Sequence, residues 1–295
     1  MKRSALLPDF IVVGPQRTGT TWLDAVLRGR VNLPRRAKET DFFTRHYAKG
    51  LDWYREYFAD ARAGFPTGEI DPNYFGAADA RDRIARDLPR CRIVCTLRDP
   101  TERAYSSYRT MRRDAWTRVG FEETVARNEV IRESSRYAHH LRAWQQLFAP
   151  DRVLVLLYDD LEAAPQLFLD RVCLFIGIPP FPLAEVPDAQ LRINTVEIAP
   201  RSRRIAQNAR NARDWMREHK WRRTISALDR LGVWRWSFGG GEEFAPMDLD
   251  VESRLRDHFR AEVEAFEALI VRDLSSWKFG RHAQPNHRTR GRASA

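Results

Sequence analysis

The stretch Phe10-Ile-Val-Val-Gly-Pro-Gln-Arg-Thr-Gly-Thr-Thr-Trp22 decides the fold of this chain. It begins as a continuous apolar run, breaks at Gly14, and continues from Thr20 as the start of a helix. Between Gly14 and Thr21 the spacing is that of the P-loop, GxxxxGK[ST], whose backbone N–H groups and helix N-terminus hold phosphate oxygens. The stretch therefore predicts a strand, an anion-binding loop and a helix.

One position of this loop departs from the nucleoside triphosphatase pattern. Thr20 occupies the place of the lysine that reaches the β- and γ-phosphates, and a cation, Arg17, lies three residues earlier inside the loop. We therefore expect the loop to bind an anion other than a triphosphate. The alternative is an ordinary strand-turn-helix unit with a glycine after the strand.

A second motif follows the apolar run Arg92-Ile-Val-Cys-Thr-Leu97, which is typical of a short buried strand. Arg98 comes directly after this run, and Ser106 comes eight residues later, on the expected next helix. A guanidinium binds phosphate as a bidentate fork, and a hydroxyl near a helix start can donate to the same oxyanion. Taken singly, Arg98 fits a simple helix start and Ser106 a solvated helix face.

Together these motifs resemble the 5′-phosphosulfate loop and the 3′-phosphate motif of sulfotransferases that use 3′-phosphoadenosine 5′-phosphosulfate (PAPS). The resemblance implies that Arg98 and Ser106 bind the 3′-phosphate. It also implies that the phosphosulfate is bound by the loop residues Arg17, Thr18, Gly19, Thr20 and Thr21. Trp22 stands where relatives place a tryptophan against the adenine, but it also begins the apolar face of a helix, and both roles stay open.

A third segment, Lys38-Glu-Thr-Asp-Phe-Phe43, resembles the heparan-sulfate and related Golgi sulfotransferases and their bacterial relatives. In that group the glutamate of an ExxFF-like stretch is the general base, which implies this role for Glu39. Asp41 is the nearest competitor. Histidines are possible bases too, but none lies in a matching motif; the candidates are His46, His139 and His140.

Sulfuryl transfer needs a base for the acceptor proton and a positive group where charge builds on the departing phosphate oxygen. The resemblance gives these roles to Glu39 and Arg17. Because a guanidinium stays protonated in proteins, Arg17 is expected to stabilise the leaving oxygen and not to protonate it.

The apolar runs alternate with helical patterns along the chain, as βαβ units do. Strands are expected over 10–14, 92–97 and 153–158, each followed by a helix, over 20–29, 101–113 and 164–176. Leu154-Val-Leu-Leu157 is continuously apolar, as in a strand covered on both faces. This order predicts an α/β, P-loop-like three-layer fold with a central parallel sheet flanked by helices.

The chain of 295 residues, 43% hydrophobic and 31% charged, suits a single domain over 1–277. Residues 178–247 read as a basic lid or insert, in which 194–204 could close over the nucleotide with Arg201 as a contact; the alternative is a solvated arginine-rich face. Residues 248–277 predict one long amphipathic helix, and 278–295 a disordered tail.

The formal net charge of +10 suits an anionic cofactor, and no recognisable nucleic-acid motif accompanies it. The cysteines lack metal-ligand spacing and read as small buried hydrophobes; they are Cys91, Cys95 and Cys173. No signal peptide or membrane span is recognisable, so we expect a cytoplasmic enzyme without stable membrane insertion.

The function implied by the resemblance is transfer of the sulfuryl group from PAPS to a hydroxyl or amine of a small-molecule or carbohydrate acceptor, without a metal. The aromatic residues expected to line the acceptor side are Trp53, Tyr54, Tyr57, Phe58 and Tyr74. The alternatives are a P-loop kinase using ATP and magnesium, and a non-catalytic nucleotide-binding module. Neither the acceptor nor the oligomeric state can be read from the sequence.

Overall fold

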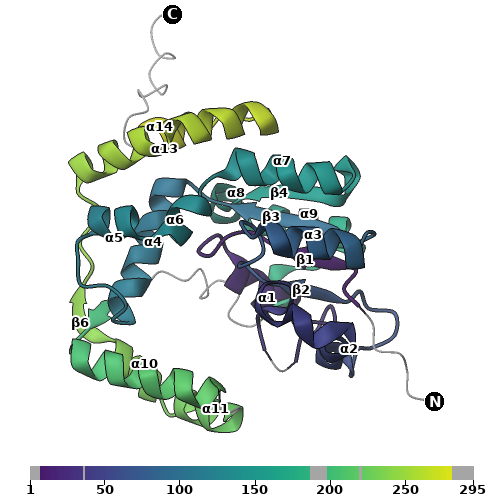
Figure 1. Ribbon diagram of the computed structural model, residues 1–295, viewed down its shortest axis with the longest axis horizontal. Coiled ribbons are helices and arrows are strands. Elements are labelled where there is room, and N and C mark those ends of the chain that lie inside the picture. Colours follow the sequence, from purple (N-terminus) through teal and green to yellow (C-terminus); the bar gives the residue numbers. More distant parts are fainter. Residues whose placement is uncertain (1–6, 36, 187–197, 219–220, 281–295) are drawn as a thin grey trace, which may run out of the picture.

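The computed structural model describes residues 7–35, 37–186, 198–218 and 221–280 (Figure 1). At its centre lies a four-stranded sheet with the order β2-β1-β3-β4, and every neighbouring pair in it is parallel. The strands are β1 (Phe10–Val12), β2 (Gly68–Ile70), β3 (Arg92–Leu97) and β4 (Val153–Leu157). The predicted α/β fold with a parallel sheet is confirmed, and three of its four strands are those that the apolar runs predicted.

The fourth strand, β2, was not predicted. Its middle residue, Glu69, is a charged side chain that is completely buried, and charged residues are ordinarily a signal against a buried strand. Gly68 lies against the Phe10 ring so closely that an added Cβ would be 2.1 Å from it. Both features depend on the neighbouring strand β1, so the local sequence of β2 does not reveal them.

Helices cover both faces of the sheet, because alternate residues of its strands enter two separate cores. Phe10 and Val12 point into the core formed with α1 (Thr20–Leu27), α8 (Tyr158–Ala163) and α9 (Pro165–Ile176). Ile11 and Val13 point into the core formed with α3 (Ala78–Asp87), α7 (Tyr137–Leu147) and α13 (Leu249–Ile270). Gly177, with φ 82°, ends α9 in the left-handed conformation that favours glycine.

The other helical elements lie before, between and after these. The remaining α-helices are α2 (Gly50–Arg55), α4 (Pro100–Arg113), α5 (Phe121–Arg127), α6 (Glu129–Glu133), α10 (Arg203–Glu218), α11 (Arg222–Arg230), α12 (Val233–Phe238) and α14 (Ser275–Phe279). Single turns of other helix types are Phe42–His46, Tyr47–Lys49, Glu56–Phe58, Pro150–Arg152 and Leu183–Glu185. Among the helices described, none is both long and apolar enough to cross a membrane.

The expectation of one long helix over 248–277 is wrong. Val271 takes a left-handed conformation with φ 52° and ends α13, and α14 starts only at Ser275. The break is held by Glu267, whose carboxylate accepts hydrogen bonds from the Leu274 amide and from Lys278. The break lets Trp277 return to the core, where it is 2% exposed.

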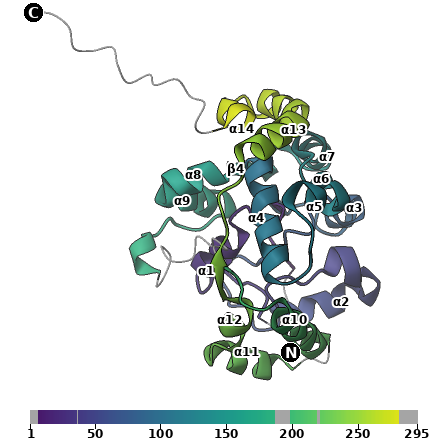
Figure 2. The same cartoon turned by 90° about the vertical axis from the view of Figure 1, so that its left-hand side faces the viewer.

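The predicted basic insert contains a small helical unit whose core, with Ala206, Trp234 and Phe238, also includes Ala115 from the segment after α4. Strands β5 (Ile198–Pro200) and β6 (Gly240–Glu243) pair antiparallel and flank α10 to α12. In both views this unit lies at the opposite end of the molecule from α13 (Figures 1 and 2). Residues 194–197 of the expected nucleotide-covering loop lie outside the described residues, as do 281–295 of the expected disordered tail.

Candidate active site

The predicted phosphate loop lies between β1 and α1. Gly14 packs against β3 so tightly that a Cβ there would lie 2.1 Å from Thr96 Oγ1. Arg17 and Gly19 both have positive φ, at 74° and 92°, and they turn the backbone sharply before α1 starts at Thr20. The first turn of α1 has no side-chain cap. Its N–H groups are therefore in the position in which helix N-termini bind anions.

The loop threonines take different roles. Thr18 is buried, and its hydroxyl donates to the Pro15 carbonyl at 2.6 Å and lies 2.9 Å from Thr96 Oγ1, so its side chain stabilises the loop itself. Thr20 is also buried. Thr21 is exposed and lies next to Lys38. Of the three hydroxyls, that of Thr21 is the one at the surface of the loop.

Arg17 leaves the loop toward α4 and meets the second motif there. Its Nε donates to Ser106 Oγ at 2.9 Å, although 89 residues separate the two in the sequence. Burial, then the positive charges of Arg113, Arg98 and Arg109, lower the pKa of Arg17 to about 10. The guanidinium therefore remains charged at neutral pH, within a group of like charges that an anion would stabilise.

Arg98 directly follows β3, and Ser106 lies within α4. Asp99 caps α4 by accepting hydrogen bonds from the Thr101 and Glu102 amides, and it forms a buried ion pair with Arg256 at 2.7 Å. The Arg98 guanidinium lies 4.4 Å from the centre of the Tyr158 ring, at the start of α8. The structure thus places Arg17, Arg98 and Ser106 in one region.

Trp22 is 2% exposed and packs edge-on against Phe168 of α9, with ring centroids 6.0 Å apart. Of the two roles left open for this residue, the burial favours packing between α1 and α9. Arg201 lies in the separate unit around β5 and β6, where its guanidinium is 5.6 Å from the Trp236 ring centre. A nucleotide contact by Arg201 stays a prediction.

The base segment, Lys38 to Phe43, contacts the phosphate loop through Lys38. Lys38 Nζ lies 3.1 Å from Glu39 Oε1 and also 3.1 Å from Thr21 Oγ1. The Glu39 side chain is 32% exposed, so its carboxylate can reach an acceptor. The Asp41 amide donates to Asp71 Oδ2, and the Asp41 carboxylate accepts from Asn73 Nδ2, both at 2.9 Å. Both carboxylates are half-buried, and the assignment of the base to Glu39 stays a prediction.

Two buried carboxylates that contact this segment, Glu69 and Asp71, were not identified from the sequence. Glu69 is fully buried and accepts hydrogen bonds from the Thr40 amide and hydroxyl and from the Tyr54 and Tyr74 hydroxyls. Burial raises the pKa of Glu69 to about 7 against the opposing effect of these bonds. Burial, then the charge of Glu69, also raises the pKa of Asp71.

Glu69 and Asp71 are spaced two residues apart, so they leave β2 on the same face. They accept hydrogen bonds from the amides of the two residues that follow the predicted base, Thr40 and Asp41. A pair of carboxylates at this spacing beside a predicted site is the signal that could have identified them.

The expected aromatic lining of the acceptor side is wrong for three of its five residues and stays a prediction for Trp53 and Tyr57. Tyr54, Phe58 and Tyr74 are at most 2% exposed and belong to the core. Tyr54, for example, stacks on Phe42 with centroids 4.4 Å apart. Trp53 and Tyr57 remain half-buried at the surface. Helical spacing turns Tyr54 and Phe58 inward, four residues apart, and Tyr54 then supports the base segment by stacking on Phe42.

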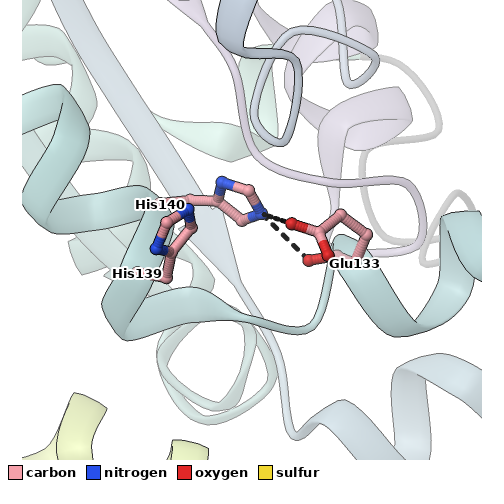
Figure 3. Close-up of side chains that lie close together, drawn as sticks. All are labelled: Glu133, His139 and His140. Carbon is pink, nitrogen blue, oxygen red and sulfur yellow. Dashed lines mark hydrogen bonds and ion pairs between the residues drawn. The ribbon is translucent and has the colours of Figure 1, made fainter.

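Of the three candidate histidines, His46 ends the turn Phe42–His46 that follows the predicted base, and the other two lie on α7. Figure 3 shows His139 and His140 of α7 beside Glu133 of α6, with potential ligand atoms within 4.8 Å of one another. His140 Nε2 lies 2.9 Å from the Glu133 backbone oxygen, and burial lowers the pKa of His140 to about 4. The Glu133 carboxylate also pairs with Arg136 at 3.0 Å. The cluster therefore joins the end of α6 to α7 and is no part of the loop region.

Residues 7–195 match the family described as "Sulfotransferase domain". The chain is 32% identical over 198 residues to bifunctional heparan sulfate N-deacetylase/N-sulfotransferase 3 of Mus musculus, covering 59% of this chain and 23% of that protein. It is 30% identical over 287 residues to the corresponding protein 1 of Mus musculus, covering 86% of this chain and 28% of that protein. The chain thus spans only about a quarter of the length of these relatives.

Among solved structures, the fold is similar to that of a sulfotransferase from Alicyclobacillus acidocaldarius. The TM-score is 0.68 at 21% sequence identity, and the match covers 92% of this chain and 99% of the other. At this identity the likeness shows the fold alone. Since the family match extends over more than half of the chain and includes both phosphate motifs, the chain belongs to the sulfotransferase domain family.

Proposed function

We propose that this protein transfers the sulfuryl group of PAPS to a hydroxyl or amine of a small-molecule or carbohydrate acceptor. The observation that carries the proposal is the hydrogen bond between Arg17 and Ser106. It joins a loop suited to the phosphosulfate to a helix suited to the 3′-phosphate, the group that distinguishes PAPS from ATP. Membership of the sulfotransferase family supports the same chemistry.

The donor would bind along the loop and α4. The amides of 18–21 and the N-terminus of α1 would hold the phosphosulfate, and Arg98 and Ser106 the 3′-phosphate. Arg109 lies three residues after Ser106, on the same face of α4. Its Nε is buried and has no hydrogen-bond partner among the described residues, which suits a further contact to an anion.

In the proposed reaction, the acceptor oxygen or nitrogen attacks sulfur while Glu39 takes its proton. The bond between sulfur and the phosphate oxygen breaks, and Arg17 stabilises the charge on the departing oxygen. The second pKa of a phosphate monoester is about 6, so this oxygen can leave as an anion at neutral pH. Arg17 therefore need not donate a proton, and the proposed chemistry needs no metal.

The acceptor side differs in charge from the donor side. Two half-buried carboxylates lie there, those of Glu39 and Asp41, and the buried Asp71 accepts a hydrogen bond from the Asp41 amide behind them. Gln16 donates to Asn73, which donates to Asp41, so a chain of polar side chains runs along this edge. Such a surface favours neutral or cationic acceptor groups with hydroxyls or amines, and it disfavours anionic groups.

Thermal unfolding with 3′,5′-adenosine bisphosphate, the product nucleotide, tests the donor site against ADP with magnesium. At about 100 times the Kd, a ligand adds ~2.7 kcal/mol of stability, which should raise Tm by roughly 5 to 10 °C. A rise with the bisphosphate but not with ADP is the expected result.

A rise with ADP and magnesium alone would instead favour a kinase. If the bisphosphate binds but PAPS is never turned over with a panel of phenols, sugars and amines, a non-catalytic nucleotide-binding module becomes the better description.

A further inference from the structure

Lys38 lies at the junction between the donor and acceptor sides of the proposed site. Its Nζ is 3.1 Å from Thr21 Oγ1, in the first turn of the helix that ends the phosphate loop. The same atom is 3.1 Å from Glu39 Oε1. The Lys38 side chain is 29% exposed, so it is neither locked in the core nor free in solvent.

An ordinary surface ion pair does not account for both contacts. A partly exposed pair between neighbours such as Lys38 and Glu39 contributes little to stability, too little to direct a long side chain strongly. The second contact, to Thr21, turns the ammonium toward the N-terminus of α1, where the helix dipole is positive. A cation is disfavoured at that position unless an anion binds there as well.

The residue type is also informative. The chain contains only five lysines among its 50 basic residues, so arginine is its usual cation. An arginine presents a flat fork suited to a phosphate, as expected of Arg17 and Arg98. A lysine presents a compact charge with three N–H donors that can point to three separate acceptors. Thr21 and Glu39 account for two of these donors.

We propose that Lys38 is a catalytic residue that contacts the oxygens of the sulfuryl group during transfer while it remains next to Glu39. The proposal rests on the proposed PAPS-dependent reaction. As the acceptor atom bonds to sulfur, the sulfur–oxygen bond to the phosphate breaks, and its electron pair goes to the departing phosphate oxygen. The acceptor proton goes to Glu39, and Lys38 keeps its own proton throughout.

This assignment divides the charge stabilisation between two cations. Arg17 stabilises the departing phosphate oxygen, and Lys38 stabilises the non-bridging oxygens of the sulfuryl group as it moves toward the base. Because Lys38 Nζ also lies 3.1 Å from Glu39 Oε1, the ammonium and the predicted base face the same point between donor and acceptor.

The test exploits the fact that PAPS and 3′,5′-adenosine bisphosphate differ only in the sulfuryl group. Calorimetric titration gives the affinity of the full chain for each nucleotide, in the unchanged protein and in Lys38→Met. A lost contact between a charged donor and the sulfuryl oxygens should weaken PAPS binding about tenfold or more and leave bisphosphate binding unchanged. Lys38→Arg should restore part of the difference.

Arg35→Met is the matched control, since it removes one positive charge from the same segment. Arg35 pairs with Asp60 at 2.6 Å on the surface and should affect neither nucleotide selectively. If Lys38→Met weakens the binding of both nucleotides equally, or changes neither affinity, only the role proposed for Lys38 is overturned. Failure of the unchanged protein to bind either nucleotide would overturn the proposed function together with this inference.

Discussion

Arg17 Nε donates a hydrogen bond of 2.9 Å to Ser106 Oγ, and this contact joins the phosphate loop to α4. Ser106 is 2% exposed, so its hydroxyl faces Arg17 and not bulk solvent. The bond also keeps Arg17 turned toward the group of arginines on α4, whose charges lower its pKa. The contact thus fixes a cation of the loop beside the residues predicted to bind the 3′-phosphate.

Ser106→Ala should weaken the binding of 3′,5′-adenosine bisphosphate about tenfold and leave any weak ADP binding unchanged, because ADP lacks the 3′-phosphate. Calorimetric titration with both nucleotides measures this selectivity. The control is Ser107→Ala, since the Ser107 hydroxyl donates within α4 to the Arg103 carbonyl at 3.0 Å. Equal effects of the two substitutions would contradict the assignment of Ser106.

Glu39→Gln should lower the rate of sulfuryl transfer by about 10² to 10⁴, because an amide cannot take the acceptor proton. Bisphosphate affinity should be retained, since Glu39 lies on the acceptor side. The measurement is release of the bisphosphate from PAPS with whichever acceptor supports turnover by the unchanged protein. Asp41→Asn is the comparison: if it abolishes transfer while Glu39→Gln does not, Asp41 is the base.

Gly14→Ala should destabilise the fold, because the new Cβ would lie 2.1 Å from Thr96 Oγ1 and within reach of the β3 backbone. Overpacking of this kind typically costs about 1 to 3 kcal/mol, which corresponds to a fall in Tm of roughly 2 to 12 °C. Gly76→Ala is a suitable control, since its Cβ would meet its nearest neighbour, His140 Nε2, at an ordinary 3.5 Å. A similar Tm for both variants would refute the packing argument.

Glu69 should make stability depend on pH. Its pKa is raised from 4.5 to about 7, so the folded state binds its proton more tightly than the unfolded chain does. Its contribution is therefore fully present below pH 4.5 and is lost as the pH rises to about 7. The Tm of the unchanged protein should fall relative to that of Glu69→Gln across this interval.

Thermal denaturation of both proteins at a series of pH values measures this difference. Burial, then the charge of Glu69, raises the pKa of Asp71, so the difference between the two curves reports Glu69 together with its effect on Asp71. Curves that remain parallel between pH 4.5 and 7 would show that the Glu69 carboxyl does not titrate as expected.

The sequence by itself predicted the strands β1, β3 and β4, the helices that follow them, and the order of the two phosphate motifs. These features are local: continuous apolar runs, helical periodicity and fixed spacing within a loop all act between residues close in the chain. The prediction of one long C-terminal helix was wrong because it too used only a local pattern. The apolar period continues past Val271, although the backbone there turns to φ 52°.

Only the tertiary structure decided which residues meet across long separations. In the folded chain Glu69 is buried in a strand although it is charged. Tyr54, Phe58 and Tyr74 lie in the core, and Lys38 contacts Thr21. The free energies of such contacts depend on partners supplied by other elements, and no local pattern records those partners. The sequence therefore determined the chemical groups of the site, and folding decided how they are oriented and charged.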